Sequence, residues 1–201
     1  LDVGTGTGLI ALMLAQRSAP SVKIRAIDIN PGSVACAAKN FSNSPWAERL
    51  KAQETSLQAF AAKSTERFDL IVSNPPFFPE RTLSPDQERS MARHSGTLSL
   101  ADLLECVNSL LLPDGKCCFI LPEKEGKRLC EMSVPLGLFC TREVQVRSKV
   151  GKPVERLLLQ LEREPGRFSR ETLEIYVAGG GYSAAYRSLT KDFYLNKQEK
   201  F

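Results

Sequence analysis

The sequence predicts an α/β fold in which a mostly parallel sheet of seven strands is covered by helices on both faces. Short apolar runs alternate along the chain with stretches of helical periodicity, which is the pattern of repeated βα units. Near the end, two apolar runs are joined through Gly151-Lys152-Pro153, which predicts an antiparallel hairpin. The sequence has no internal repeat, linker or low-complexity tract, so we expect a single domain over residues 1–201.

The first half of the chain contains four of the predicted strands. They occupy residues 1–3, 22–28, 50–53 and 68–73, with helices over residues 9–16 and 31–40. Pro31 suits the first turn of the second helix, because its ring fixes φ and its missing N–H has no partner there. Residues 1–3 already have the pattern of a strand end, so we expect a further segment upstream of the given sequence.

The second half begins with a helix whose start is marked by a capping box between Ser99 and Asp102. Its apolar residues fall on one face and comprise Leu100, Leu103, Leu104, Val107, Leu110 and Leu111. Further strands are predicted over residues 116–121, 138–147 and 154–162, with a helix over 125–134. The tail, residues 172–201, is expected to hold a short strand, a break at three glycines and a polar helical end.

Composition excludes several classes of protein. No apolar run approaches the roughly 18 residues of a membrane span, and no His, Cys or carboxylate cluster has metal-ligand spacing. The six cysteines form no CxxC pair and mostly lie in apolar runs, which predicts free thiols in the reducing cytoplasm. A net charge of +4 is compatible with nucleic acid as a partner but does not by itself indicate one.

The first candidate site is a glycine turn, Asp2-Val3-Gly4-Thr5-Gly6-Thr7-Gly8. Glycines allow a tight turn and let a ligand approach the backbone closely. Dinucleotide-binding enzymes use GxGxxG to place a pyrophosphate at a helix terminus, whereas here the spacing is GxGxG and an acid precedes it. An acid repels phosphate and attracts a cation, so S-adenosylmethionine, with its sulfonium and amino groups, fits better. The alternative is an ordinary loop.

Asp28 ends the second predicted strand, at a distance from the turn that is typical of nucleoside-binding α/β folds. Its carboxylate is placed to accept hydrogen bonds from ribose hydroxyls. Ligands of such folds bind at the carboxyl ends of the strands, where the strand order reverses, and the glycine turn and Asp28 both lie at such ends. The alternative is a surface acid near a helix start.

The second candidate site follows the strand over residues 68–73 and reads Asn74-Pro75-Pro76-Phe77. The two prolines have fixed φ and no N–H, so this corner is stiff and presents the Asn74 side-chain oxygen and the Pro75 carbonyl as acceptors. Two converging acceptors suit an NH₂ group, and Phe77 offers a face on which a planar ring can stack. The alternative is a plain turn after a strand.

An exocyclic amine needs such a corner because its lone pair is delocalised into the ring. Acceptors on both hydrogens favour a pyramidal nitrogen, whose lone pair can then attack a methyl group in line, so that alignment supplies most of the rate. Adenine N6, guanine N2 in ribosomal RNA and a protein glutamine amide all present such a nitrogen, and the corner alone does not separate them.

The segments LDVGTGTG, AIDIN and SNPPFF together resemble the class I S-adenosylmethionine-dependent methyltransferases. The segments SPDQERSMARHSGTLSLADLL, DGKCCFILP, GKPVERLLLQL and LTKDFYL extend the likeness to the bacterial valine-tRNA adenine N6-methyltransferases, over nearly the whole chain. The resemblance implies a Rossmann-like class I methyltransferase fold and methyl transfer from S-adenosylmethionine to adenine N6 in tRNA, at the adenine 3′ of the anticodon.

The resemblance also assigns residues. Asn74, Pro75, Pro76 and Phe77 are expected to hold the target base, and the cofactor is expected to contact Asp2, Gly4, Thr5, Gly6, Gly8, Asp28, Ile29, Ser56 and Leu57. Family members often have an acid that meets the cofactor's adenine amine. Here the aligned residue is Ser56, and Glu54 is the alternative.

RNA contacts are expected from Arg89 and Arg93, which a helix would place on one face, although a solvated loop explains them equally well. The single histidine, His94, is expected to be a surface residue, and the lysines of the tail (Lys191, Lys197 and Lys200) to be solvated. A binding protein without catalysis is the remaining alternative, and the intact Asn74 and glycine turn argue against it. The sequence does not predict the oligomeric state.

Overall fold

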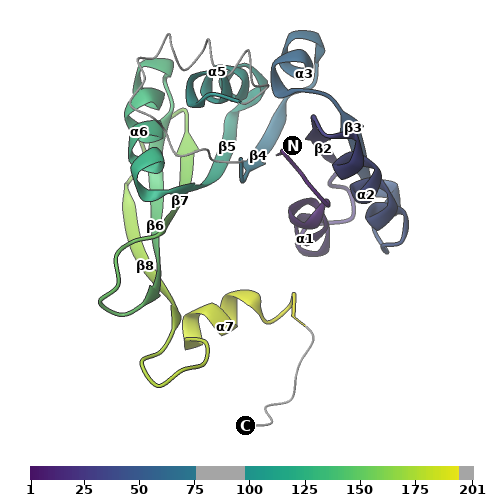
Figure 1. The fold of residues 1–201 in the computed structure, drawn as a ribbon. Coiled ribbons are helices and arrows are strands. Elements are labelled where there is room, and N and C mark those ends of the chain that lie inside the picture. Colours follow the sequence, from purple (N-terminus) through teal and green to yellow (C-terminus); the bar gives the residue numbers. More distant parts are fainter. Residues whose placement is uncertain (76–97, 195–201) are drawn as a thin grey trace.

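The computed structural model describes residues 1–75 and 98–194, whose strands form one eight-stranded sheet of order β3-β2-β1-β4-β5-β7-β6-β8 (Figure 1). The strands are β1 (Asp2–Val3), β2 (Ile24–Asp28), β3 (Leu50–Glu54), β4 (Phe68–Ser73), β5 (Leu111–Pro122), β6 (Phe139–Lys149), β7 (Arg156–Glu162) and β8 (Ser169–Tyr176). Only β7 among them runs antiparallel to its neighbours, β5 and β6. The carboxyl ends of the other seven strands therefore lie along one edge of the sheet, here called the carboxyl edge.

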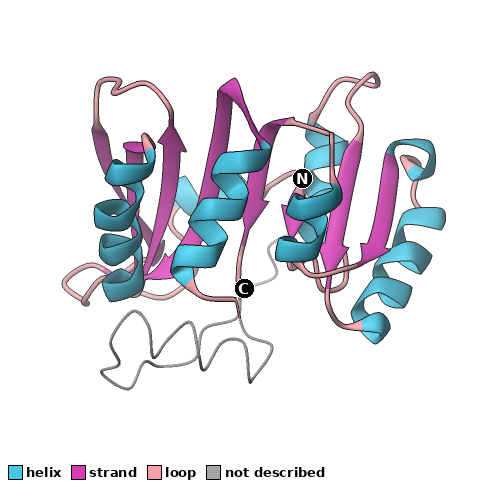
Figure 2. Ribbon diagram, turned by 90° about the horizontal axis from the view of Figure 1, so that it is seen from above, coloured by secondary structure: helices cyan, strands magenta, loops and turns pink. Residues whose placement is uncertain are grey.

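Helices connect the strands and cover both faces (Figure 2). They are α1 (Leu9–Arg17), α2 (Pro31–Ser42), α3 (Leu57–Lys63), α5 (Leu100–Leu110), α6 (Glu123–Ser133) and α7 (Ala184–Thr190), with one-turn 3₁₀ helices η1 (Ala47–Arg49) and η2 (Val134–Leu136). From β1 the chain first moves outward to β3 and then returns to β4 on the other side of β1. Because parallel crossovers are right-handed, this reversal puts α1 and α2 on one face and α3 and α5 on the other.

Polar side chains begin several of these helices. Asn30 accepts a hydrogen bond from the backbone N–H of Ser33 (2.9 Å) at the start of α2, and Ser99 accepts one from Asp102 (3.0 Å) at the start of α5. Ser183 does the same for Tyr186 (3.0 Å) at the start of α7. Each cap satisfies a backbone donor that the helix itself leaves free. The cap predicted at Ser99 is thereby confirmed.

Two hydrophobic clusters hold the layers together. The cluster beneath α1 and α2 is built mainly from small side chains, comprising Ala11, Ala15, Ile24, Ala26, Ala37 and Phe41. The cluster beneath α3, α5 and α6 is larger, and its fully buried leucines are Leu103, Leu104, Leu110, Leu121, Leu129, Leu138, Leu157, Leu159 and Leu161.

The predicted mixed sheet and its hairpin are confirmed, with three differences. The short strand expected in the tail is β8, which joins the same sheet beside β6 as an eighth strand. Helix α3 was missed, although Ser56 caps it and Leu57 and Phe60 are its buried residues. The turn expected at residues 113–115 is an irregularity within β5, where the pairing with β4 shifts register.

The prediction of one domain over residues 1–201 stays a prediction, since residues 76–97 and 195–201 are not described. Within the described ranges, no helix has the length and apolar character that crossing a membrane requires.

Candidate active site at the carboxyl edge of the sheet

The glycine turn joins β1 to α1, and each of its glycines has positive φ: Gly4 at 70°, Gly6 at 56° and Gly8 at 83°. Residues other than glycine rarely adopt this backbone conformation. A Cβ on Gly4 or Gly6 would meet nothing within 4 Å, so the backbone there borders open space. A Cβ on Gly8 would lie 2.5 Å from the Phe41 ring, so this glycine lets α1 pack closely on α2. Gly4 and Gly6 therefore leave room for a ligand, and Gly8 serves packing.

The turn is fixed to the neighbouring strand β2. The backbone N–H groups of Gly4 and Thr5 both donate to the Ile27 carbonyl, at 2.9 and 3.0 Å. Asp28 accepts a hydrogen bond from the Gly6 N–H through one carboxylate oxygen and from the Asn30 N–H through the other, both at 2.9 Å. Asp28 thus holds the turn in shape. Each of its oxygens retains a further lone pair for the predicted ribose contact.

Asp2 lies beneath the turn and is fully buried. Its Oδ2 accepts a hydrogen bond from the Thr5 hydroxyl at 2.6 Å, while its Oδ1 has no hydrogen-bond partner. Burial raises the pKa of Asp2 above its ordinary value, and the Thr5 hydrogen bond opposes that rise. A buried carboxylate oxygen without a hydrogen-bond partner lowers the stability of the fold unless a ligand donates a hydrogen bond to it. The backbone N–H of Ala11 also favours the ionised carboxylate, and Oδ1 can still accept a hydrogen bond from a ligand.

The end of β3 lies beside the end of β2, because Asp28 and Glu54 are register partners and the Thr55 N–H donates to the Asp28 carbonyl at 2.9 Å. Ser56 caps α3 by accepting from the Ala59 N–H at 3.1 Å, so its hydroxyl proton is still free to be donated. The Leu57 side chain is buried, which leaves its backbone N–H as the group that can meet a ligand. Glu54 and Ile29 are exposed at this edge. The choice between Ser56 and Glu54 stays open.

The predicted corner follows β4 on the other side of β1. Val3 and Ser73 are register partners, which places Asn74 across from Gly4. The Asn74 side chain is exposed, whereas Pro75 is buried and anchors the corner. The remaining predicted contacts (Pro76, Phe77, Arg89 and Arg93) lie outside the described residues, as does His94.

Ser73 was not predicted as a site residue. It is buried, and its hydroxyl donates to the Val3 carbonyl at 2.9 Å, which ties the strand before the corner to the strand before the glycine turn. The signal in the sequence is a lone hydroxyl among the apolar residues of β4, directly before Asn74.

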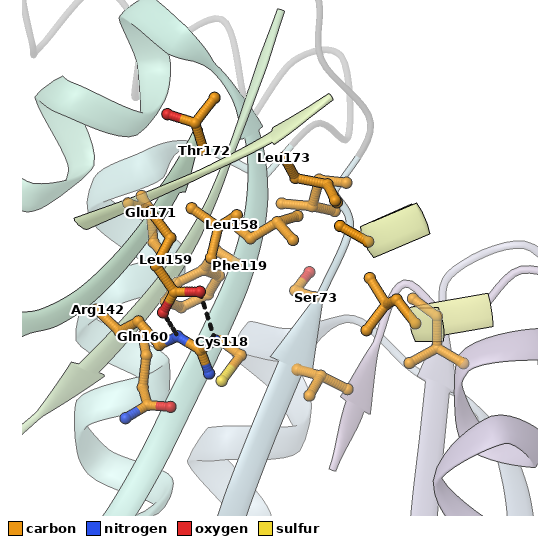
Figure 3. Close-up of a pocket in the computed structure, with 16 residues that line it drawn as sticks. Ser73, Cys118, Phe119, Arg142, Leu158, Leu159, Gln160, Glu171, Thr172 and Leu173 are labelled. Atoms are coloured by element: carbon orange, nitrogen blue, oxygen red, sulfur yellow. Dashed lines mark hydrogen bonds and ion pairs between the residues drawn. The ribbon is translucent and has the colours of Figure 1, made fainter. Parts of the chain in front are cut away.

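A hollow of about 520 Å³ lies on the sheet face between β4–β8 and the helices α1 and α7 (Figure 3). Its lining is mostly apolar, with Ser73 at one side and the ion pair of Arg142 and Glu171 (3.0 Å) at another. Among the described residues, none of those predicted for the site lines it, but Ser73 directly precedes Asn74 and Ile10 follows the glycine turn. The hollow therefore adjoins the site at the carboxyl edge.

Metal chemistry has no candidate within residues 1–75 and 98–194, where no group of three or more His, Cys, Asp or Glu side chains is placed to hold an ion. All six cysteines are free thiols, of which Cys117 is fully buried. Burial raises the pKa of the Cys117 thiol to about 12, so it is inert as a nucleophile at neutral pH.

Comparisons with known proteins identify the family of this chain. The methyltransferase small domain family matches residues 1–98, which include the turn, Asp28 and the corner. Curated tRNA1(Val) (adenine(37)-N6)-methyltransferases from Yersinia enterocolitica and Yersinia pseudotuberculosis are 39% identical to this chain over 196 residues, covering 98% of the chain and 78% of each relative.

Solved methyltransferase structures share the fold. A predicted O-methyltransferase from Agrobacterium tumefaciens superposes with a TM-score of 0.70 at 13% identity, covering 94% of this chain and 86% of its own. A methyltransferase from Pyrococcus furiosus gives a TM-score of 0.58 at 22% identity, covering 82% and 74%. The chain has the Rossmann-like class I methyltransferase fold, whose methyl donor is S-adenosylmethionine, and it belongs to the tRNA1(Val) (adenine(37)-N6)-methyltransferase family.

Proposed function

We propose that this protein transfers a methyl group from S-adenosylmethionine to the exocyclic N6 of adenine 37 in tRNA1(Val), the adenine 3′ of the anticodon. The relatives that bear this name match 98% of the chain. Because tRNA is its proposed substrate, we also place the enzyme in the cytoplasm.

The residues at the carboxyl edge fit the cofactor. Asp2 Oδ1 is buried without a partner and suits the cofactor's ammonium group. Gly4 and Gly6 leave open space above their backbone for the methionine part, and Asp28 retains acceptor lone pairs for the ribose. Ile29, 59% exposed, offers an apolar contact to the adenine ring. Ser56 or Glu54 would meet the adenine amine.

A single observation carries the proposal of methyl transfer to an amine. Val3 and Ser73 are paired in register, so the turn that fits the cofactor and the Asn74 corner emerge side by side from neighbouring strands. Parallel strands are about 4.8 Å apart. A ligand in the turn and a base at the corner would therefore be close enough for direct transfer, with no carrier group between them.

The residues of this chain orient the amine. The Asn74 side-chain oxygen and the Pro75 carbonyl accept the two N–H hydrogens, so the nitrogen lone pair points at the methyl group. The bound cofactor supplies a methyl group made electrophilic by the adjacent sulfonium. In the reaction the nitrogen would bond to the methyl carbon as the bond from that carbon to sulfur breaks, and the extra proton on nitrogen would then pass to solvent. Alignment contributes most of the rate, and a strong general base is not required.

The experiment that tests the function is transfer of labelled methyl groups from S-adenosylmethionine to unmodified tRNA1(Val), followed by nuclease digestion to identify the labelled nucleoside. We expect N6-methyladenosine at position 37. A tRNA with guanine at that position is the matched control and should remain unlabelled. Label in a protein or in ribosomal RNA, with none in tRNA, would support the glutamine amide or guanine N2 as the substrate instead.

A further inference from the structure

A second cluster of unassigned residues lies on the carboxyl edge, at the end of the sheet away from the cofactor. Lys149, at the end of β6, is the register partner of Tyr176, at the end of β8. Figure 1 shows the β6–β7 turn and the segment leading into α7 at the same end of the molecule. Because β8 is parallel to β6, and β6 to β5 and β4, this end faces the same way as the Asn74 corner.

Three tyrosines form a stack at this end. The rings of Tyr176 and Tyr182 lie 5.3 Å apart between centroids at an angle of 19°, and those of Tyr182 and Tyr186 lie 4.9 Å apart. Tyr182, the middle ring of the stack, is 43% exposed, and Tyr176, at one end of it, is 38% exposed. More than a third of each tyrosine is therefore accessible at the surface.

The backbone holds the stack in place. Tyr176 and Tyr182 are joined by a β-bridge, and the Ser183 N–H donates to the Ile175 carbonyl at 2.8 Å. The turn between them requires positive φ at Gly180 and Gly181, so glycine is needed for the two rings to face each other. The rings are thus presented at little further cost in conformational entropy when a ligand binds.

Positive charge adjoins the stack. Residues 147–156 contain four cations and one acid, and residues 176–187 contain one cation and no acid. Arg147 is opposite Glu174 in the sheet, which offsets part of its charge. Lys149 and Lys152 are exposed and form no ion pair within the part of the chain that the structure describes. Exposed aromatic rings beside unpaired cations are the combination that binds single-stranded nucleic acid.

We propose that Lys149, Lys152, Tyr176 and Tyr182 form an RNA-binding surface, here called the tyrosine surface, that contacts unpaired nucleotides beside the target base. Tyr176, at the end of the stack, would stack on a base, Tyr182 would support its ring from the other side, and the lysines would contact phosphates. Four strand spacings separate β4 from β8, a distance of about 19 Å. A single strand of a few nucleotides can cover this distance, and single-strand binding sites hold roughly 4–16 nucleotides. The proposal rests on the proposed function for its choice of RNA.

Binding of a fluorescent anticodon stem-loop to the full chain tests the surface, measured by anisotropy over a range of salt concentrations. Tyr176→Ala should weaken binding about fivefold or more, because a base loses its stacking partner, with an unchanged salt dependence. Tyr176→Phe keeps the ring and should bind like the wild type. Lys149→Gln with Lys152→Gln should reduce the slope of log K against log salt by about 1.4, since each phosphate contact to a single strand contributes about 0.7.

Matched controls exist elsewhere on the molecule. Phe168, 46% exposed, immediately precedes β8 and so lies at the opposite edge of the sheet, and Lys63 is an exposed lysine at the end of α3. Phe168→Ala and Lys63→Gln should bind as the wild type does. If the test and control variants all had wild-type circular dichroism and bound RNA equally well, the proposal of the tyrosine surface would be overturned. A chain that binds RNA through these residues but transfers no methyl group to tRNA would support the surface and overturn the proposed activity.

Discussion

The two sides of the sheet, here called the alanine half and the leucine half of the molecule, pack in opposite ways. Under α1 and α2, the buried residues are mainly alanines, and the Phe41 ring occupies the space left by Gly8. Under α3, α5 and α6, leucines fill the core. Small side chains allow helices to lie close to the strands, so the turn can hold a ligand through its backbone and Asp28 through its carboxylate. The leucine half provides a stable support for the Asn74 corner and the tyrosine surface. Close packing in the alanine half thus positions the cofactor turn, and the rigid core of the leucine half positions the corner for the target base.

The comparison predicts that the leucine half is the more sensitive to lost volume. Leu161 is fully buried on β7, opposite Cys117 of β5. Leu161→Ala should lower the free energy of unfolding by about 2–5 kcal/mol through lost burial and the cavity that remains. Urea denaturation measures this loss. Calorimetric titration below the denaturation midpoint should give an unchanged affinity for S-adenosylmethionine, and a large loss of affinity would show that the halves are not independent.

Turnover should depend on the junction between β1 and β4, from which the turn and the corner emerge. Asn74→Ala removes one of the two acceptors for the amine and should reduce kcat by about 100-fold, the scale of a misaligned reacting group. Affinity for S-adenosylmethionine should change little, because Asn74 lies outside the turn. Single-turnover methylation and calorimetry measure the two quantities. Wild-type turnover in the Asn74→Ala variant would remove this residue from the mechanism.

The alanine half should be the more sensitive to added volume. Ala37 is fully buried, and its Cβ lies 3.2 Å from where a Cβ on Gly8 would be. Ala37→Leu should cost about 1–3 kcal/mol of stability and should also weaken cofactor binding by displacing the turn. Ala61→Leu in α3, where the alanine is only partly buried, is the control. Equal cofactor affinity in the two variants would contradict the proposed role of close packing.

Cofactor affinity should depend on pH through Asp2. Burial raises the pKa of this carboxyl, and a cationic ligand prefers its ionised form. Affinity should therefore fall as pH is lowered through the raised pKa, by up to about tenfold per pH unit. The free energy of unfolding should change in the opposite direction, because ionising the buried Asp2 costs free energy. Protonation removes this cost, so the protein should become more stable as pH falls from the raised pKa toward the ordinary one. Asp2→Asn should abolish this part of both dependences, measured by calorimetry and urea denaturation.

The smallest expected effect is at the hydrogen bond that joins β4 to β1. Ser73→Ala removes the hydrogen bond to the Val3 carbonyl and should cost about 0.5–1.5 kcal/mol. If this bond sets the spacing between the turn and the corner, kcat should fall severalfold while the KM for S-adenosylmethionine is nearly constant. Ser44→Ala, which removes a hydroxyl bond of the same kind to the Phe41 carbonyl, is the control. An equal effect of both substitutions on kcat would make Ser73 an ordinary structural residue.

Features that depend on nearby residues could be predicted from the sequence. The glycine turn, Asp28 and the Asn74 corner are each short motifs at strand ends, and parallel pairing brings the strand ends together. The missed helix α3 has only seven residues, too few for a clear periodic pattern. Asp2 Oδ1 could not be recognised as an unpartnered atom because that depends on what surrounds it. The tyrosine stack depends likewise on the pairing of β8 with β6, which no local pattern specifies.

The pairing of Val3 with Ser73 also bears on how the enzyme is made. The two residues are 70 positions apart, yet the site exists only when they are neighbours. On a ribosome, the β1–α1–β2 unit emerges early and its glycine turn can form against β2. The corner can join it only after about 45 further residues, from Asp28 to Ser73, several seconds later at the usual rate of synthesis. A nascent chain shorter than this could recognise the cofactor without any capacity to modify RNA.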